Sequence, residues 1–372
     1  MVAPPGPPPF RTPLDRLPVL GIAGWSGSGK TALVEELVEA LRREGLRPAV
    51  VKHDAHGVSL DARGKDSDRI FRAGAEVLLE GPGERLLRSR TLRDSELWAR
   101  IAELASRSDI VIAEGFKALP APKLWLADRE GRGPPDGVPS VVATLAWGED
   151  RLRAAVRIAR DLVETRFRET PLWGCILIGG KSSRMGRPKH LLPALEDGGG
   201  CPRGRSWLER TSGLLSGFCE KVVLAGAGAV PEALAGAPRL PDAPGIQGPM
   251  AGVLAAMRWA PGASWLVAAC DLPRLRREAL SWLVATRRPG VWATIPRARV
   301  GGSVEPLLAA YDFRARSALE DLASEGTFSM AALAGRPGVI TPVVPAAIAP
   351  AWEDADLPSD LPRGRTSRAR PG

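Results

Sequence analysis

Short apolar runs alternate with amphipathic stretches along the first part of the chain. The run 19–23 has the pattern of a buried strand, and the stretch after it repeats apolar residues at helical spacing. The same pattern predicts strands at 49–52, 110–113, 123–127 and 141–145, and a last helix over 150–167. Strands that alternate with helices are typical of a doubly wound α/β fold, which is our prediction for this block.

A second block with the same alternation comes after a short connector at 168–172. It opens on the apolar run 175–178, and further strands are predicted near 222–224, 265–269, 291–295 and 304–311, with helices between them. The glycine-rich stretch 196–205 is predicted to be a surface loop. We therefore predict two doubly wound domains, at 17–167 and 173–362, joined by the linker 168–172, with a disordered leader at 1–16 and a disordered tail at 363–372.

Composition narrows the class of protein. The 372 residues are 44% hydrophobic and 25% charged, as in ordinary globular proteins. The chain has no apolar stretch of the ~18 residues that a membrane helix needs, and its proline-rich start has no secretory pattern, so we expect a cytoplasmic protein without a membrane partner. The four cysteines lack the short paired spacing of a zinc site or a disulfide framework.

The net charge of +9 raises the question of nucleic-acid binding. Arginines are spread along the chain among acidic residues, and the single tyrosine offers little for base stacking. We therefore expect no nucleic-acid partner. A basic surface suits polyphosphate substrates equally well.

The segment GWSGSGKT at residues 24–31 matches the phosphate-binding P-loop pattern G-x-x-x-x-G-K-[ST]. It lies directly after a predicted strand and opens a predicted helix, so backbone N–H groups and the helix N-terminus would face phosphate oxygens. Lys30 would reach the β- and γ-phosphates, and the Thr31 hydroxyl would bind Mg²⁺. Block one is thus predicted to have the P-loop NTPase fold, with nucleotide contacts from Gly24, Ser26, Gly27, Ser28, Gly29, Lys30 and Thr31.

An acidic residue at the end of a neighbouring strand should complete the metal site of the P-loop. Glu114 ends the predicted strand 110–113 and is our candidate, whereas Asp109 begins that strand and is the weaker one. A structural surface acid is the alternative interpretation of Glu114.

A second phosphate-binding loop is predicted at residues 177–189, LIGGKSSRMGRPK. A buried strand ends in Gly179 and Gly180, and Arg184 and Lys189 come next among small residues, an arrangement that would neutralise a leaving pyrophosphate. Asp271 lies at the end of another buried strand, at the sheet edge where a Mg²⁺-binding carboxylate is expected.

These segments resemble two families of one pathway. The second block is similar to molybdenum cofactor guanylyltransferases of MobA type in LIGGKSSRMGRPK (177–189), GPMAG (248–252), CDLP (270–273) and the closing DADLPSDL (354–361). Ala225 and the pair Asp354 and Asp356 stand where that family has asparagines. The first block resembles the GTP-binding adaptor of MobB type in its P-loop, KH (52–53), GKDS (64–67), AGA (73–75) and EGFK (114–117).

The resemblance implies a Rossmann-like nucleotidyltransferase fold for the second block and a bifunctional protein. It would transfer GMP from GTP to molybdopterin, giving molybdopterin guanine dinucleotide and pyrophosphate, with Mg²⁺ as cofactor. Catalysis would fall to Lys189, Arg184 and Asp271, of which Asp271 holds the metal. GTP would bind at Leu177, Ile178, Gly179, Gly180, Lys189, Asp242, Gly248 and Asp271.

The resemblance also implies molybdopterin-loading proteins and apo-molybdoenzymes as partners, and places any homo-oligomer contact in the N-terminal domain. That domain is either a weak GTPase or a passive GTP-binding adaptor. Three alternatives remain open for the whole chain: a cytidylyltransferase that acts on the same pterin with CTP, a sugar-phosphate nucleotidyltransferase, and a kinase built on the P-loop alone. A delivery adaptor without catalysis is a further alternative.

Overall fold

The computed structural model describes residues 17–53, 64–90, 94–179, 188–194 and 205–355. The chain forms two compact units, residues 13–163 and 164–372, and the division falls within helix α4 (Arg151–Glu169). The predicted leader, the tail, nearly all of the loop 196–205 and the residues Gly180, Arg184 and Asp356 lie outside the described residues. None of the described helices is both long and apolar enough to cross a bilayer.

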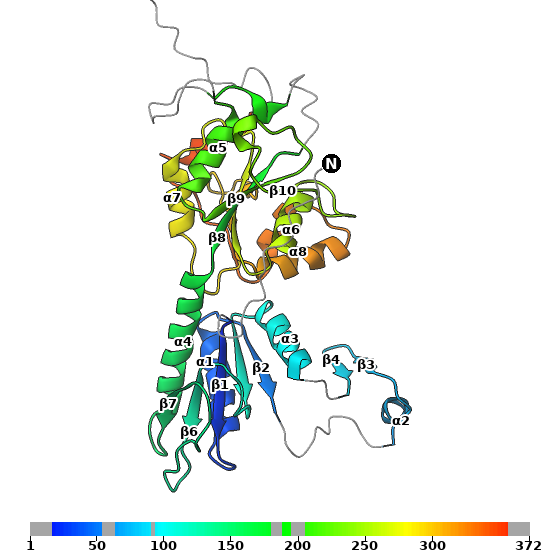
Figure 1. The fold of residues 1–372 in the computed structure, drawn as a ribbon, viewed down its shortest axis with the longest axis vertical. Coiled ribbons are helices and arrows are strands. Elements are labelled where there is room, and N and C mark those ends of the chain that lie inside the picture. The colour runs from blue at the N-terminus through cyan, green and yellow to red at the C-terminus, as the bar shows by residue number, and fades with distance from the viewer. Residues whose placement is uncertain (1–16, 54–63, 91–93, 180–187, 195–204, 356–372) are drawn as a thin grey trace, which may run out of the picture. The chain divides into compact units, whose positions relative to one another are not determined.

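The first unit is built on a five-stranded parallel sheet with the order β2-β5-β1-β6-β7 (Figure 1). Every neighbouring pair in this sheet runs parallel, so all five carboxyl ends lie at one edge. The prediction of a doubly wound α/β fold is confirmed for this unit. Its strands are β1 (Val19–Gly24), β2 (Pro48–Lys52), β5 (Ile110–Glu114), β6 (Lys123–Leu126) and β7 (Val141–Leu145).

Helices cover both faces of this sheet because its strands are apolar on both sides. Helices α1 (Lys30–Arg43) and α4 pack with Leu20 and Ile22 of β1 on one face. Helix α3 (Asp94–Ala105) packs with Val19 on the other face. Helix α2 (Asp66–Arg72) and the antiparallel pair β3 (Val77–Glu80) and β4 (Arg85–Arg88) were not predicted from the pattern.

The second unit contains a seven-stranded sheet with the order β10-β9-β8-β11-β13-β12-β14. Strands β10, β9, β8 and β11 run parallel, whereas β13 runs antiparallel to β11, so the sheet is mixed. Helices α5 and α7 pack on one face and helices α6 and α8 on the other. The strands are β8 (Leu172–Leu177), β9 (Lys221–Ala225), β10 (Arg239–Leu240), β11 (Ser264–Ala269), β12 (Ala293–Thr294), β13 (Leu308–Tyr311) and β14 (Val339–Ile340).

Of the four α-helices that the structure describes in this unit, the first three lie between predicted strands, as expected, and the fourth follows the last predicted strand. They are α5 (Trp207–Ser216), α6 (Pro249–Trp259), α7 (Arg277–Ala285) and α8 (Ala315–Ser324), with 3₁₀ turns η2 (Lys189–Leu191), η3 (Glu232–Leu234), η4 (Met330–Gly335) and η5 (Ala349–Trp352). Three cysteines of this unit, Cys175, Cys219 and Cys270, are buried and free.

Several predicted boundaries differ from the structure. The connector expected at 168–172 is shorter, because α4 continues to Glu169 and β8 already begins at Leu172. The strands expected at 291–295 and 304–311 shrink to β12 and β13. In both cases apolar residues outside the strand are buried by packing against neighbouring elements, and the pattern alone does not separate such residues from strand residues.

Candidate functional site

The P-loop connects β1 to α1 at the carboxyl edge of the first sheet. Its glycines are required by close packing and by backbone conformation. A Cβ on Gly24 would lie 2.6 Å from Ser28 Oγ and 2.7 Å from Leu126 O, and Gly29, the N-cap of α1, has φ 87°. The loop therefore folds back tightly over the N-terminus of α1, which is the geometry that a phosphate-binding loop needs.

Polar atoms of the P-loop point to an anionic ligand. Lys30 Nζ donates to Trp25 O at 2.8 Å and to Gly24 O at 3.2 Å, so its ammonium lies over the loop. Burial lowers the pKa of Lys30. The negative charge of Glu114 raises this pKa, and the positive charges of Lys117 and Lys52 lower it further. The buried Ser28 Oγ has no hydrogen-bond partner among the described residues. Among the described residues whose charges act on Lys30, two lysines face one carboxylate, an excess of positive charge that suits a polyphosphate.

The two predicted metal ligands of this unit are in direct contact. Strand β5 pairs with β1, and Thr31 Oγ1 donates to Glu114 Oε1 at 2.6 Å. Lys52, at the end of β2, donates to Thr31 Oγ1 at 3.1 Å and lies 3.4 Å from Glu114 Oε1. A hydroxyl and a carboxylate fit Mg²⁺, which binds through few protein oxygens together with phosphates.

Asp109 has a different environment from Glu114. It lies just before β5, at the opposite edge of the sheet, and its buried carboxylate accepts hydrogen bonds from Arg47 N at 2.8 Å and Arg47 Nε at 3.1 Å. Of the two candidates, Glu114 is thus the one that lies beside the P-loop.

The second site lies at the ends of β8 and β11, which are neighbours in the second sheet. Lys189 begins the 3₁₀ turn η2, and Asp271 lies just beyond β11. Lys189 Nζ lies 3.3 Å from Asp271 Oδ2, and the two side chains are 12% and 25% exposed. Burial raises the pKa of Asp271, and Lys189 partly offsets this. A partly exposed carboxylate next to an ammonium group fits a Mg-nucleotide site.

The turn η2 is positioned by a histidine that was not a candidate from the sequence. The buried His190 ring contacts Ala229 O through Nε2 at 2.7 Å. Gly228 lies so close that a Cβ there would overlap Ile178 O and approach His190 Cε1 at 2.9 Å. His190 therefore holds the turn that carries Lys189 against the segment that follows β9. Its position directly after Lys189 is the sequence feature that could have identified His190 as part of the site.

The segment that would face the nucleobase is assembled around Gly252 of α6. A Cβ on Gly252 would lie 2.8 Å from Leu177 Cδ2, 3.2 Å from Ala225 Cβ and 3.7 Å from Asp242 Oδ1. The absence of a side chain lets α6 approach the ends of β8 and β9. Asp242, Leu177 and the α6 N-cap Gly248 thus belong to one region, together with the buried Ala225.

The closing segment reaches this second site as well. Ala355 N donates to Asp271 O at 3.1 Å, and the charge of Asp354 raises the pKa of Asp271 and of Glu305. Glu305, whose pKa is raised mainly by burial, was not a sequence candidate because it lies in no recognised motif. Within the described part of the chain, no three His, Cys, Asp or Glu residues are grouped as a metal site.

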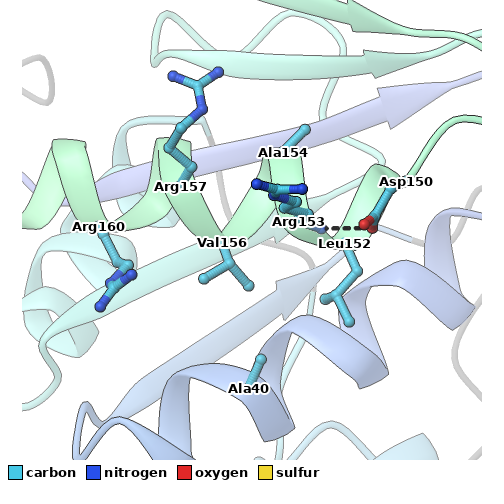
Figure 2. A pocket seen from close by; sticks show the side chains of 8 residues that line it. All are labelled: Ala40, Asp150, Leu152, Arg153, Ala154, Val156, Arg157 and Arg160. Atoms are coloured by element: carbon cyan, nitrogen blue, oxygen red, sulfur yellow. Dashed lines mark hydrogen bonds between the residues drawn. The ribbon is translucent and has the colours of Figure 1, made fainter.

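A cavity of about 780 Å³ lies elsewhere on the first unit, between α1 and the start of α4 (Figure 2). None of the residues predicted to bind nucleotide or metal lines it. Arginines on α4 and Ala40 of α1 contribute to its wall; the full set is Ala40, Asp150, Leu152, Arg153, Ala154, Val156, Arg157 and Arg160.

Fold and site together define the class: a P-loop nucleotide-binding unit joined to a unit of the nucleotidyltransferase class. Comparison with family models gives "Molybdopterin guanine dinucleotide synthesis protein B" at residues 19–146 and "MobA-like NTP transferase domain" at residues 174–336. The chain is 36% identical over 135 residues to the molybdopterin-guanine dinucleotide biosynthesis adapter protein of Haemophilus influenzae. That match covers 36% of this chain and 75% of the relative. The chain belongs to this family of adapter proteins and carries a MobA-like NTP transferase domain in the same polypeptide.

Two further relatives match parts of the chain. A molybdenum cofactor biosynthesis bifunctional protein of Synechocystis is 37% identical over 131 residues, which is 34% of this chain and 35% of that protein. A probable molybdenum cofactor guanylyltransferase of Bacillus cereus (strain Q1) is 28% identical over 165 residues, 43% of this chain and 78% of that protein. The resemblance inferred from the motifs is confirmed for both units.

Proposed function

We propose that the second unit transfers GMP from GTP to molybdopterin or its molybdenum-loaded form, giving molybdopterin guanine dinucleotide and pyrophosphate. The observation that carries the proposal is the contact of Lys189 with Asp271 at the ends of β8 and β11. Relatives named molybdenum cofactor guanylyltransferases support GTP as the nucleotide and the pterin as the acceptor.

In this reaction the terminal phosphate of molybdopterin attacks the α-phosphorus of GTP, and the bond to the pyrophosphate oxygen breaks. The nucleophile is already an anion, so the protein has to position it and neutralise charge rather than remove a proton. Lys189 Nζ would move from Asp271 to the phosphates and stabilise the negative charge of the leaving pyrophosphate. Asp271 would hold Mg²⁺, which when bound supplies further positive charge against the triphosphate.

On the base side, we propose that Asp242 and the backbone of the segment from Gly248 to Gly252 face guanine. Gly252 brings the start of α6 against Leu177, and Asp242 lies beside it. A carboxylate can accept hydrogen bonds from the N–H groups of guanine, which adenine does not offer in that arrangement. Asp242 would thereby compensate for Ala225, which has no polar side chain.

Pyrophosphate release tests the proposal directly. Purified full-length protein would be given Mg²⁺ and molybdate-loaded molybdopterin, with GTP, CTP, ATP and UTP offered separately. Release with GTP alone supports the guanylyltransferase. Release with CTP instead establishes the cytidylyltransferase and identifies the acidic closing segment around Asp354 as the feature that selects the base. If no pyrophosphate is released with any of the four nucleotides, the guanylyltransferase proposal fails and the non-catalytic adaptor is the remaining alternative.

For the first unit we propose binding of Mg-GTP at the P-loop, through Lys30, Thr31 and Glu114, in support of cofactor transfer to molybdopterin-loading proteins and apo-molybdoenzymes. The contact of Thr31 with Glu114 beside Lys30 supports this role. A slow GTPase and a passive adaptor differ in phosphate release. Full-length protein that carries Lys189→Ala and Asp271→Asn, without molybdopterin, should release phosphate from GTP only in the first case. Lys30→Ala is the control that assigns any release to the P-loop.

A further inference from the structure

An exposed tryptophan lies near the P-loop and contacts two arginines. Trp147 comes shortly after β7, and 43% of its surface is exposed. The guanidinium carbon of Arg129 lies 5.0 Å from the centre of its ring, and that of Arg151 lies 5.1 Å from it. A large flat apolar group that stays open to solvent between cations offers a stacking surface for an aromatic, electron-rich ligand.

Arg151 connects this ring to the phosphate-binding loop. Its Nη1 donates to Ser28 O at 2.8 Å, its Nη2 to Ala127 O at 2.5 Å and its Nε to Ala146 O at 2.8 Å. The side chain thus joins the P-loop to the segments after β6 and β7. Because β1, β6 and β7 are parallel, these segments lie at the same edge of the sheet. The Arg151 side chain therefore contacts both the Trp147 ring and the P-loop backbone that would hold the phosphates.

Hydrogen bonds within the chain hold the segment that carries Trp147. Glu149 Oε2 accepts a hydrogen bond from Ala146 N at 3.0 Å, and Arg151 N donates to Glu149 O at 2.8 Å. The turn that carries Arg129 is fixed as well, because Asp128 Oδ1 accepts from the backbone N–H groups of Glu130 and Arg132. A site that is already in place loses little conformational entropy on binding.

The guanidinium of Arg129 is available for a ligand. Over the stretches of chain that the structure describes, it has no hydrogen-bond or carboxylate partner, and it contacts the ring of Trp147. A guanidinium matches two neighbouring acceptors, such as O6 and N7 of guanine, whereas adenine presents one acceptor and one donor at that edge.

We propose that Trp147 is the stacking platform for the base of the nucleotide whose phosphates lie in the P-loop, and that Arg129 reads the O6 and N7 edge of guanine. The ligand is a purine nucleoside triphosphate, with guanine preferred. This inference rests on nucleotide binding by the P-loop, and it adds a base subsite that the P-loop motif itself does not contain.

The test compares ligands with and without a base. Affinities for GTP, ATP and inorganic triphosphate are measured by calorimetry on the full-length chain carrying Lys189→Ala and Asp271→Asn, which suppress the second nucleotide site. Trp147→Ala should weaken GTP binding about tenfold or more while leaving triphosphate binding unchanged. Trp147→Phe should recover much of the loss. Arg129→Gln should lower GTP affinity and leave ATP affinity equal or higher, because glutamine pairs with adenine.

Val142→Ala, which trims an exposed side chain of β7, is the matched control and should change nothing. Equal losses for GTP and triphosphate with Trp147→Ala would overturn the inference, because Trp147 would then only support the loop. Unchanged GTP binding would overturn it too, by placing the base elsewhere, while leaving the proposed P-loop function intact. If Lys30→Ala leaves GTP affinity intact, the proposed P-loop function fails, and the base subsite fails with it.

Discussion

Lys189 Nζ and Asp271 Oδ2 are 3.3 Å apart although 82 positions separate the two residues in the chain. The contact forms because β8 and β11 are adjacent parallel strands, so the segments that continue from their carboxyl ends meet at one edge of the sheet. Each side chain offsets the charge of the other, and under the proposed function a Mg-nucleotide would separate them. Such a pair is suited to binding a polyanion and a cation together.

Lys189→Ala should reduce the turnover of GMP transfer by about 100-fold or more, because it removes a cation that stabilises the departing pyrophosphate. The fold should survive, since Lys189 lies in a short 3₁₀ turn and belongs to no hydrophobic core. Single-turnover pyrophosphate release and circular dichroism would measure both effects. Arg258→Ala, which removes a positive charge from the surface of α6 in the same unit, is the control and should leave turnover unchanged. Near-normal turnover of Lys189→Ala would exclude the proposed role.

Lys52→Met should reduce the Mg²⁺ concentration needed for half-maximal GTP binding at the P-loop by severalfold. The Lys52 ammonium contacts both Thr31 Oγ1 and Glu114 Oε1, so it competes with a divalent cation for the same oxygens. Calorimetric titration of GTP at a series of Mg²⁺ concentrations would measure this shift. Lys65→Met, which removes a lysine at the exposed N-cap of α2, serves as control. A higher Mg²⁺ requirement in Lys52→Met would show that Lys52 instead assists nucleotide binding.

Gly228→Ala should destabilise the second unit by about 1–3 kcal/mol, because the new methyl group would overlap Ile178 O and press on the His190 ring. Displacement of His190 would also shift Lys189, so GMP transfer should fall. Urea unfolding and pyrophosphate release would measure the two effects. In Gly236→Ala the new Cβ would meet no heavy atom of the described residues within 4 Å, its chain neighbours aside, so stability and transfer should stay close to those of the unaltered chain. Equal behaviour of both variants would contradict the packing argument.

Acid should loosen the segment around α2 through Asp68. Its buried carboxylate accepts hydrogen bonds from Gly64 N at 2.9 Å and Arg72 Nε at 2.8 Å and forms an ion pair with Arg88. The Gly64 and Arg72 hydrogen bonds, with a contribution from Arg88, lower the pKa of Asp68 from 3.8 to about 2. Because the folded-state pKa is the lower one, the stabilisation is complete above the ordinary pKa and is lost as pH falls from about 4 to 2.

Amide hydrogen exchange of α2 and β4 between neutral and acidic pH would monitor that loss. Asp68→Asn should already lower protection at neutral pH and should flatten the acid dependence. Asp66→Asn, in the same helix but 95% exposed at its side chain, is the control and should behave like the unaltered chain. Equal pH dependence in Asp68→Asn and the unaltered chain would show that another group controls this segment.

The local sequence pattern was sufficient to predict those elements and motifs that depend only on residues close together in the chain. Apolar runs predicted β1, β5, β6 and β11, because these strands are buried along their whole length and such strands are mostly apolar. The P-loop was recognisable because its glycines and Lys30 act within one turn of backbone. The pattern also predicted strands where β12 and β13 lie, but it gave neither their short lengths nor the antiparallel direction of β13, and it missed β14, because strand pairing and direction depend on long-range contacts.

The sequence by itself determined the class of this protein, through two α/β blocks, the P-loop pattern and the motifs of two related families. Tertiary structure decided which candidates meet. It placed Glu114 on Thr31 and Asp109 at the far edge of the sheet, joined Lys189 to Asp271, and put Trp147 beside the P-loop. The chemistry of each side chain is known from its residue alone. Contacts between residues that are distant in the sequence depend on strand order and packing, which are properties of the whole chain.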